Sequence, residues 1–343
     1  MQIFDSYAEL IQRIRDGGHE PRILGCAPDG SPIISVRVGG DREPAIFISA
    51  GSHSTEHAGV SAAVELIDTL DTEHRTYILP CRDPIGLNGY RYALSLGLGQ
   101  EPDLESIDDL SAFLRDHGEV LHEEDDLLVA IIGEYGYATR GMHGWSVAKA
   151  PGLEALRGRR LFFTLRSDDV EGSAPLQRAY TLIVDPDGEV LHINRFHDTG
   201  WAPSEPRCTR DLMAEIRPGL TLDLHEHGGD AFWFSARHQR NDDDEAWEKR
   251  MADAIIGAVT DSGAALMPEE YLPGSFFTKG QRSVYWLNPQ ERGEGLNLAD
   301  FGACEYGPAF TIETGMRTGF QNRVQTSMLA ARTAIGVFEE RHA

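Results

Sequence analysis

The sequence is poor in cysteine, and it lacks a long apolar run. The four cysteines, Cys26, Cys81, Cys208 and Cys304, lie far apart and form no CxxC pair. This spacing fits a reducing compartment better than a disulfide framework, and we expect the cysteines to be small buried residues. No stretch approaches the ~20 apolar residues needed to span a bilayer. The N-terminal residues also lack a basic segment followed by an apolar core, so no signal peptide is predicted. We therefore expect a cytoplasmic protein that does not enter a membrane.

Positive charge is scarce as well. The 31 Lys and Arg residues face 55 Asp and Glu residues, which gives a formal net charge of −24. A chain of this charge is repelled by phosphate backbones and anionic lipid surfaces, so a nucleic-acid or membrane partner is not expected. The acidic runs at 122–126 and 241–245 could be read as cation sites. Neither run has ordered ligand spacing, so we interpret both as solvated surface.

The 343 residues suit one large α/β unit with an inserted subdomain. Apolar strands are predicted at 33–38, 45–50, 76–79, 220–224 and 309–313, with helical patterns between them at 58–70, 210–216 and 245–260 and a further helix at the C-terminus. This alternation favours a mainly parallel sheet flanked by helices, with functional sites beyond the carboxyl ends of its strands. Residues 92–190 break the alternation and contain a predicted hairpin, so we interpret them as an insertion, which we expect to cover the site.

Two clusters of polar residues follow predicted strands. The first is GSHSTEH, with His53, Glu56 and His57, and the second is DLHEHGG, with His225 and His227. Histidine nitrogen and carboxylate oxygen are ligands that Zn²⁺ prefers, and catalytic zinc sites use three protein ligands. Read as HxxEH, the first cluster would place both histidines on one helical face, with Glu56 as a general base. The small residues before His53 instead favour the HxxE reading, in which a loop histidine and Glu56 bind metal and His57 turns away.

Five ordered segments of the chain together resemble the zinc carboxypeptidase family, the carboxypeptidase A-like metallopeptidases. The first is HxxE after a strand, and the last is a glutamate at the end of a late strand. The residues that match are His53 and Glu56; Asp83, Pro84 and Gly86; Asn194 and Arg195, followed by Ser204, Glu205 and Pro206; His225; and Glu313.

The resemblance implies a mixed, largely parallel sheet of about eight strands between helices. It implies one Zn²⁺ per chain, held by His53, Glu56 and His225, and a zinc-activated water whose proton passes to Glu313 as general base. Asn194 and Arg195 would bind a substrate carboxylate. Arg91 would polarise the scissile carbonyl. The implied activity is hydrolysis of an amide bond next to a carboxylate, in a small peptide or an acylated amino acid.

Three departures from the family pattern keep alternatives open. The long insertion could displace Arg91, which leaves Arg140, Arg166 and Arg178 as other candidates. The substrate-closing tyrosine of many members is absent at Ala303, and Tyr306 and Tyr285 are more typical of structural aromatics. Asp83 also stands where asparagine is usual.

The departures weaken peptide cleavage more than zinc hydrolysis. An N-acyl amino acid deacylase of the same fold and a catalytically silent binding module therefore remain as alternatives. His227 is a second candidate ligand, and Asp223 could support a ligand histidine. The sequence leaves the oligomeric state open.

Overall fold

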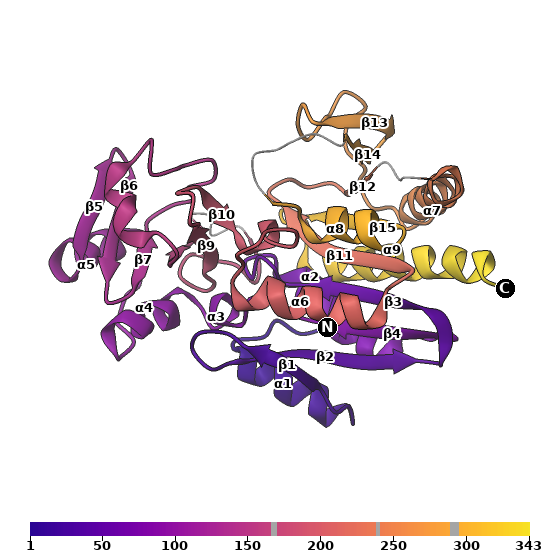
Figure 1. Cartoon of the computed structure of the whole chain (residues 1–343), viewed down its shortest axis with the longest axis horizontal. Coiled ribbons are helices and arrows are strands. Elements are labelled where there is room, and N and C mark those ends of the chain that lie inside the picture. The colour runs from indigo at the N-terminus through magenta and orange to yellow at the C-terminus, as the bar shows by residue number, and fades with distance from the viewer. Residues whose placement is uncertain (166–169, 238–240, 289–294) are drawn as a thin grey trace.

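The protein consists of two β-sheets that lie side by side, the larger of them flanked by long helices (Figure 1). The computed structural model describes residues 1–165, 170–237, 241–288 and 295–343. In spatial order, the nine strands of the main sheet are β1 (Arg22–Cys26), β2 (Pro32–Gly39), β4 (His74–Leu79), β3 (Arg42–Ala50), β11 (Leu220–His227), β15 (Ala309–Gly315), β12 (Trp233–Arg237), β14 (Val284–Leu287) and β13 (Phe277–Gln281).

The centre of the main sheet is parallel and its edges are largely antiparallel. Strands β4, β3, β11 and β15 pair in parallel, as β12 and β14 also do, whereas the pairs at both edges and the pair β12–β15 are antiparallel. The predicted mixed α/β class is therefore confirmed. The strand count of nine exceeds the expected eight or so.

Alternating side chains give the main sheet two cores. On β3, Ile46 and Ile48 pack under the helices of one face, while Phe47 between them points to the other face. The first face is covered by α1 (Tyr7–Asp16), α2 (His57–Thr69), α7 (Asp242–Asp261) and α9 (Phe320–Arg341). The second is covered by α6 (Ser204–Ile216) and α8 (Leu298–Glu305). This alternation decides which residues of β11 and β15 reach the functional site.

The second sheet lies within residues 119–192, which overlap most of the predicted insertion. Its strands, in spatial order, are β10 (Val190–His192), β9 (Tyr180–Val184), β8 (Arg160–Phe163), β7 (Tyr135–Ala138), β6 (Leu127–Ile132) and β5 (Glu119–Glu124). The predicted hairpin is confirmed as the antiparallel pair β9–β10. The chain between the two sheets forms the helices α3 (Pro84–Leu87), α4 (Tyr90–Leu98) and α5 (Ile107–His117). Two short 3₁₀ helices are also described, η1 (Pro151–Leu156) and η2 (Ile193–Arg195).

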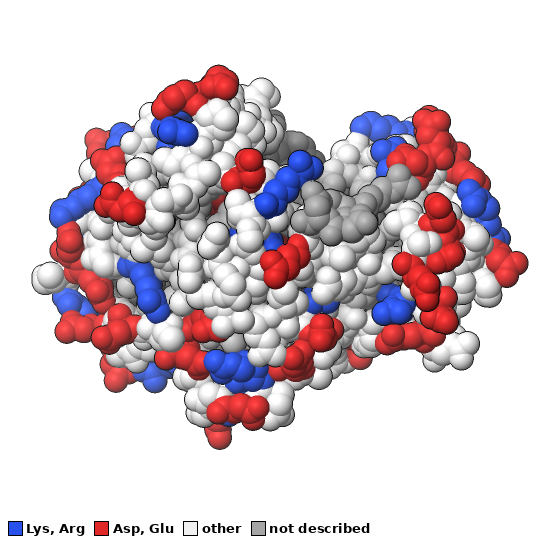
Figure 2. All heavy atoms as spheres, turned by 180° about the vertical axis from the view of Figure 1, so that it is seen from behind, with Lys and Arg blue, Asp and Glu red and all other residues white. Residues whose placement is uncertain are grey.

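The two acidic runs lie at the surface, as the sequence predicts. On the face shown in Figure 2, acidic groups are interspersed with basic ones rather than separated into one patch. The acidic run at 241–245 provides the first turn of α7, where negative side chains stabilise a helix N-terminus. None of the described helices is long and apolar enough to cross a bilayer. The expectation that all four cysteines are buried is wrong, because Cys26 is exposed and only Cys81 is fully buried.

Candidate metal centre

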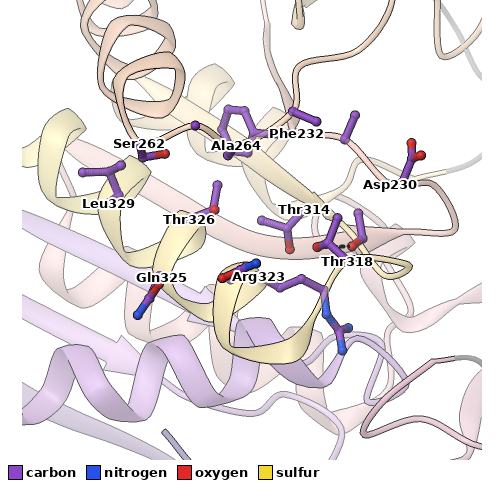
Figure 3. Close-up of a pocket in the computed structure, with 15 residues that line it drawn as sticks. Asp230, Phe232, Ser262, Ala264, Thr314, Thr318, Arg323, Gln325, Thr326 and Leu329 are labelled. Atoms are coloured by element: carbon purple, nitrogen blue, oxygen red, sulfur yellow. Dashed lines mark hydrogen bonds between the residues drawn. The ribbon is translucent and has the colours of Figure 1, made fainter.

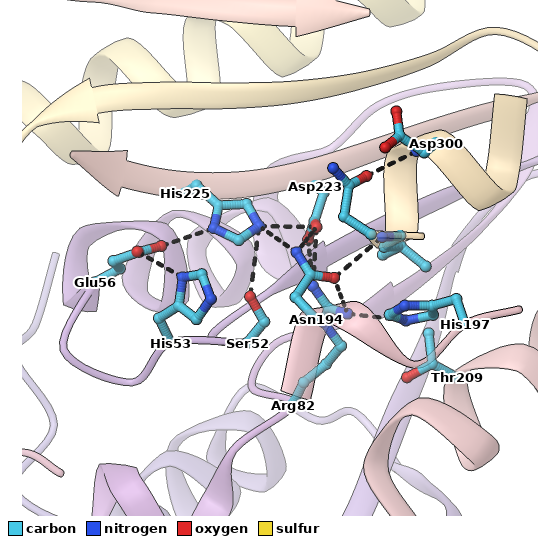
Figure 4. A network of polar contacts seen from close by, with 12 residues as sticks. Ser52, His53, Glu56, Arg82, Asn194, His197, Thr209, Asp223, His225 and Asp300 are labelled. Atoms are coloured by element: carbon cyan, nitrogen blue, oxygen red, sulfur yellow. Dashed lines mark hydrogen bonds and ion pairs between the residues drawn. The ribbon is translucent and has the colours of Figure 1, made fainter. Parts of the chain in front are cut away.

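His53, Glu56 and His225 meet at the carboxyl end of the central parallel strands. One ligand atom from each lies within 4.8 Å of the other two, and all three side chains are buried. The Nδ1 atom of His53 is 2.6 Å from one carboxylate oxygen of Glu56, and the Nδ1 atom of His225 is 2.8 Å from the other. Figure 4 shows both rings turned toward this carboxylate. Two imidazole nitrogens and a carboxylate are a donor set that suits Zn²⁺, so these residues could hold a metal ion.

The local chain explains how HxxE forms half of this site. Strand β3 ends at Ala50, and Gly51 follows with a φ of 62°, in the left-handed region that glycine adopts without strain. A Cβ at Gly51 would also lie 3.0 Å from the Cα of Cys81. The chain therefore turns sharply, His53 lies on the loop, and Glu56 caps α2. One contact fixes the loop: the backbone N–H of Glu56 donates to the carbonyl of His53 at 2.9 Å.

His57 lies away from the cluster. It is the first residue of α2 and is buried, and its Nε2 accepts a hydrogen bond from the backbone N–H of Phe4 at 2.8 Å. Its ring also stacks against Phe320. The structure thus agrees with the HxxE interpretation and not with HxxEH. His227 points into a turn of its own, where its Nε2 is 2.7 Å from the carbonyl oxygen of Ala231.

The alternation of β11 brings Asp223 beside His225. Both residues point to the α8 face, and Nε2 of His225 is 2.8 Å from a carboxylate oxygen of Asp223. Arg82 binds the same carboxylate with Nη2, at 2.8 Å and 2.9 Å. His225 therefore lies between two carboxylates, and these raise its pKa although burial lowers it. Such a position favours a positive charge at Nδ1, whether a proton or a metal ion supplies it.

The pKa values of the other groups follow from burial and neighbouring charge. Burial alone would raise the pKa of Glu56, but His53 and His225 lower it to about 2. Burial lowers the pKa of His53 to about 4, so its imidazole is neutral at physiological pH. A carboxylate and a neutral imidazole are the protonation states that metal binding requires.

Glu313 lies next to His225 on the neighbouring strand. The two residues are register partners in the parallel pair β11–β15, so their side chains point to the same face. Burial raises the pKa of Glu313 to about 8. Its Oε2 atom is buried, and within the described part of the chain it has no hydrogen-bond partner. An unpartnered buried oxygen beside a metal-binding group is well placed to receive a proton from water.

Asn194 and Arg195 are the second predicted pair, and the structure uses them differently. The amide of Asn194 is built into the network around His225: Oδ1 accepts from Arg82 at 3.0 Å, and Nδ2 lies 3.2 Å from Nε2 of His225. This amide is buried, so its predicted contact with substrate is not available in this arrangement. Arg195 is the next residue and is partly exposed. Burial lowers the pKa of the nearby His192, and the positive charge of Arg195 lowers it further.

The structure does not bring Arg91 to the cluster. Its side chain is exposed on α4, and α4 packs against strands β6, β7 and β8 of the second sheet. The role predicted for Arg91 therefore finds no supporting contact among the described residues, and it stays a prediction. Among its alternatives, Arg140 pairs with Asp126 and Arg178 binds the carbonyl of Phe4. Arg166 lies outside the described residues.

The candidates for the missing tyrosine also have other roles. The hydroxyl of Tyr285 donates to the carbonyl of Tyr271 at 3.1 Å, and the ring of Tyr306 lies under the guanidinium of Arg217. Two residues that sequence reasoning missed do reach His53, namely Tyr180 and His192. The one signal in the sequence was the position of His192 in the predicted hairpin, two residues before the matched Asn194.

A separate cavity of about 290 Å³ lies on the opposite face of the main sheet. Thr314, which alternates with Glu313 on β15, points into it, as Figure 3 shows. The guanidinium of Arg323 turns away from this cavity toward Glu226, with which it forms a buried ion pair at 2.7 Å. None of the predicted metal or substrate residues lines this cavity.

Solved structures share the fold described above. Bovine thrombin-activatable fibrinolysis inhibitor, solved with a tick carboxypeptidase inhibitor, matches with a TM-score of 0.52 at 13% identity, over 99% of this chain and 98% of that one. The chain has the carboxypeptidase fold. A metallo-carboxypeptidase from Pseudomonas aeruginosa matches with a TM-score of 0.50 at 13% identity, over 97% of this chain and 68% of that one. A metallo-carboxypeptidase from Burkholderia cenocepacia matches with the same TM-score at 10% identity, over 98% and 69%.

These likenesses confirm the fold that the five sequence segments predicted. No family profile matches the sequence, and no curated protein matches it significantly. At 10–13% identity the fold is what these likenesses establish, and the chemistry depends on the residues of this chain.

Proposed function

We propose that the protein is a zinc-dependent hydrolase that cleaves an amide bond next to a carboxylate, in a small peptide or an acylated amino acid. The observation that carries the proposal is the convergence of His53, Glu56 and His225 beside the unpartnered carboxylate oxygen of Glu313. His53, Glu56 and His225 would hold one ion per chain. When bound, zinc lowers the pKa of water and polarises a carbonyl group.

Glu313 is the proton carrier of the proposed reaction. Its Oε2 atom accepts a proton from the attacking water and returns it to the leaving nitrogen. Burial raises the pKa of Glu313 above that of an ordinary carboxyl group, which makes its carboxylate a stronger base. Asp223 and Arg82 keep His225 in place while this happens, because their side chains are buried and fixed to each other.

Arg195 is the proposed anchor for the substrate carboxylate. A planar guanidinium can bind both carboxylate oxygens at once. Its neighbour Asn194 contacts His225, so the anchor lies one residue along the chain from the cluster. Such an anchor would limit substrates to those with a carboxylate near the scissile bond, which both C-terminal peptides and N-acyl amino acids provide.

The test compares wild type with Glu313→Gln on panels of C-terminal peptides and N-acyl amino acids, after zinc loading. Glutamine keeps the size of the side chain but cannot accept the proton, so we expect kcat to fall by about 10²–10⁴-fold with unchanged zinc content. Equal product release by the two proteins would contradict the proposed role of Glu313. Turnover of the acylated amino acids alone would assign the deacylase alternative. Stoichiometric zinc without turnover of either panel would favour a silent binding module.

A further inference from the structure

Two residues of the second sheet touch His53 on the metal-binding loop. Tyr180, the first residue of β9, stacks on the imidazole with ring centroids 4.6 Å apart and planes 16° from parallel. His192, the last residue of β10, places its Nδ1 atom 2.7 Å from Nε2 of His53. These two strands pair with each other, and the second sheet thus meets the edge and one face of the same ring.

The two histidines of the cluster therefore have different partners on the side that faces away from Glu56. Nε2 of His225 faces the carboxylate of Asp223 at 2.8 Å, and Arg82 fixes this carboxylate. Nε2 of His53 faces another imidazole at 2.7 Å. The partner on the outer nitrogen of a metal-binding histidine sets its tautomer, its orientation and its basicity as a ligand.

We propose that His192 is a positioning residue for His53, so that the second sheet forms part of the metal centre. This inference rests on the metal site of the proposed function, but it does not depend on which bond the protein cleaves. With Nδ1 of His53 turned to the metal position, its Nε2–H donates to Nδ1 of His192. His192 acts as the neutral acceptor that holds the ring in this tautomer.

Tyr180 restricts the same ring from its face. Its own ring stacks on Phe163 at 4.6 Å, so three rings form a stack that begins at His53 and ends on β8. Phe163 and Tyr180 are register partners on β8 and β9. The stack prevents the imidazole from tilting, while the hydrogen bond that His53 donates to His192 stops it from flipping. Removal of the Tyr180 hydroxyl alone should not affect this role.

The geometry of the histidine side chain supplies matched variants. Nδ1 of histidine and Oδ1 of asparagine are both two bonds from Cβ, so His192→Asn keeps a neutral acceptor at the same place. His192→Asp places an anionic acceptor there, and His192→Ala removes the acceptor. His117→Ala is the control, because this histidine lies on α5 with a side chain that is 47% exposed.

The experiment measures the zinc affinity of the full-length variants by competition with a chromophoric chelator, with circular dichroism to check folding. We expect His192→Ala to weaken zinc binding by about 10–100-fold. His192→Asn should stay within about threefold of wild type, and His192→Asp should bind zinc at least as tightly as wild type, because an anionic acceptor raises ligand basicity. His117→Ala should match wild type.

The outcomes separate this inference from the proposed function. If His192→Ala binds zinc as tightly as wild type, the positioning role is refuted while the hydrolase proposal stands. If zinc affinity falls in His192→Ala and is kept in His192→Asn, but the wild-type protein hydrolyses neither substrate panel, the positioning role holds and the proposed function fails. If His192→Asn is as weak as His192→Ala, the contact is not a hydrogen bond to an acceptor and the inference is wrong. If wild type binds no zinc, both proposals fall.

Discussion

Replacement of Asp83 by asparagine should stabilise the protein, and more strongly as the pH rises. Asp83 is fully buried at the start of α3, where Oδ1 accepts the backbone N–H of Gly86 at 3.0 Å. Oδ2 lies 3.3 Å from the hydroxyl oxygen of Ser54, but this hydroxyl donates its proton to the carbonyl of Ala179 at 2.7 Å. A protonated carboxyl group can donate to Ser54 in return, whereas a carboxylate cannot. The site therefore favours the neutral group, which asparagine imitates.

The size of the effect follows from the pKa. Burial raises the pKa of Asp83 from 3.8 to about 7, so the folded state binds a proton that the unfolded state has already released. Stability consequently falls as the pH rises from the unfolded to the folded pKa, and above about pH 7 the loss is constant. At 1.36 kcal/mol per pH unit, the loss is about 2 kcal/mol at pH 5.5 and about 4 kcal/mol at pH 8.5. Asp83→Asn lacks this titration.

Urea denaturation of both proteins at about pH 5.5 and pH 8.5 measures the difference. We expect the advantage of Asp83→Asn in unfolding free energy to grow by about 2 kcal/mol between the two conditions. Asp41→Asn is the control, because the Asp41 side chain is 92% exposed and its replacement tests the effect of losing one negative charge from an acidic protein. An advantage that does not change with pH, or that Asp41→Asn reproduces, would refute the reasoning.

Three further predictions concern charged side chains. Arg323→Met should reduce the unfolding free energy by about 3–5 kcal/mol in urea titrations, because it leaves Glu226 buried without its ion-pair partner. Arg250→Met, which breaks an exposed ion pair, should change the unfolding free energy little. Equal effects of the two substitutions would contradict this prediction. Asp223→Asn should weaken zinc binding by about 10–100-fold in chelator competition, because His225 loses its anionic hydrogen-bond acceptor. An unchanged zinc affinity would show that Asp223 contributes only to the packing of the protein core. Arg195→Lys should raise KM for carboxylate-bearing substrates by a larger factor than it lowers kcat, because lysine lacks the planar guanidinium group that binds both carboxylate oxygens. An unchanged KM would exclude Arg195 as the anchor for the substrate carboxylate.

Sequence reasoning worked where local pattern determines position. The strand ending at Ala50 and the small residues after it were enough to place His53 on a loop and Glu56 at a helix start. Asp223, proposed as a support for a ligand histidine, does lie beside His225, and Glu313, proposed from the family resemblance, is the register partner of His225. The placement of His53 and Glu56 depends on a strand end and a turn, which are legible in a single segment, whereas the placement of Glu313 came from the order of segments in the family resemblance.

Sequence reasoning failed where position depends on distant segments. Arg91 is predicted from its place in the order of matched segments, but in the structure α4 packs on the second sheet and exposes this side chain. His192 and Tyr180 reach His53 across more than 120 residues, through the docking of one sheet on another, and no local pattern encodes such a contact. Arg82 was overlooked next to Asp83 because a buried arginine is recognisable only once its partners, Asp223 and Asn194, are placed.

Zinc content after loading and exhaustive dialysis tests the central claim most directly. The measurement compares wild type with single alanine variants of His53, Glu56 and His225, and with His57→Ala as the matched neighbour. Wild type and His57→Ala should each retain about one zinc ion per chain, while the three ligand variants should retain almost none. Retention of zinc by all three ligand variants, or its loss from His57→Ala alone, would contradict the account.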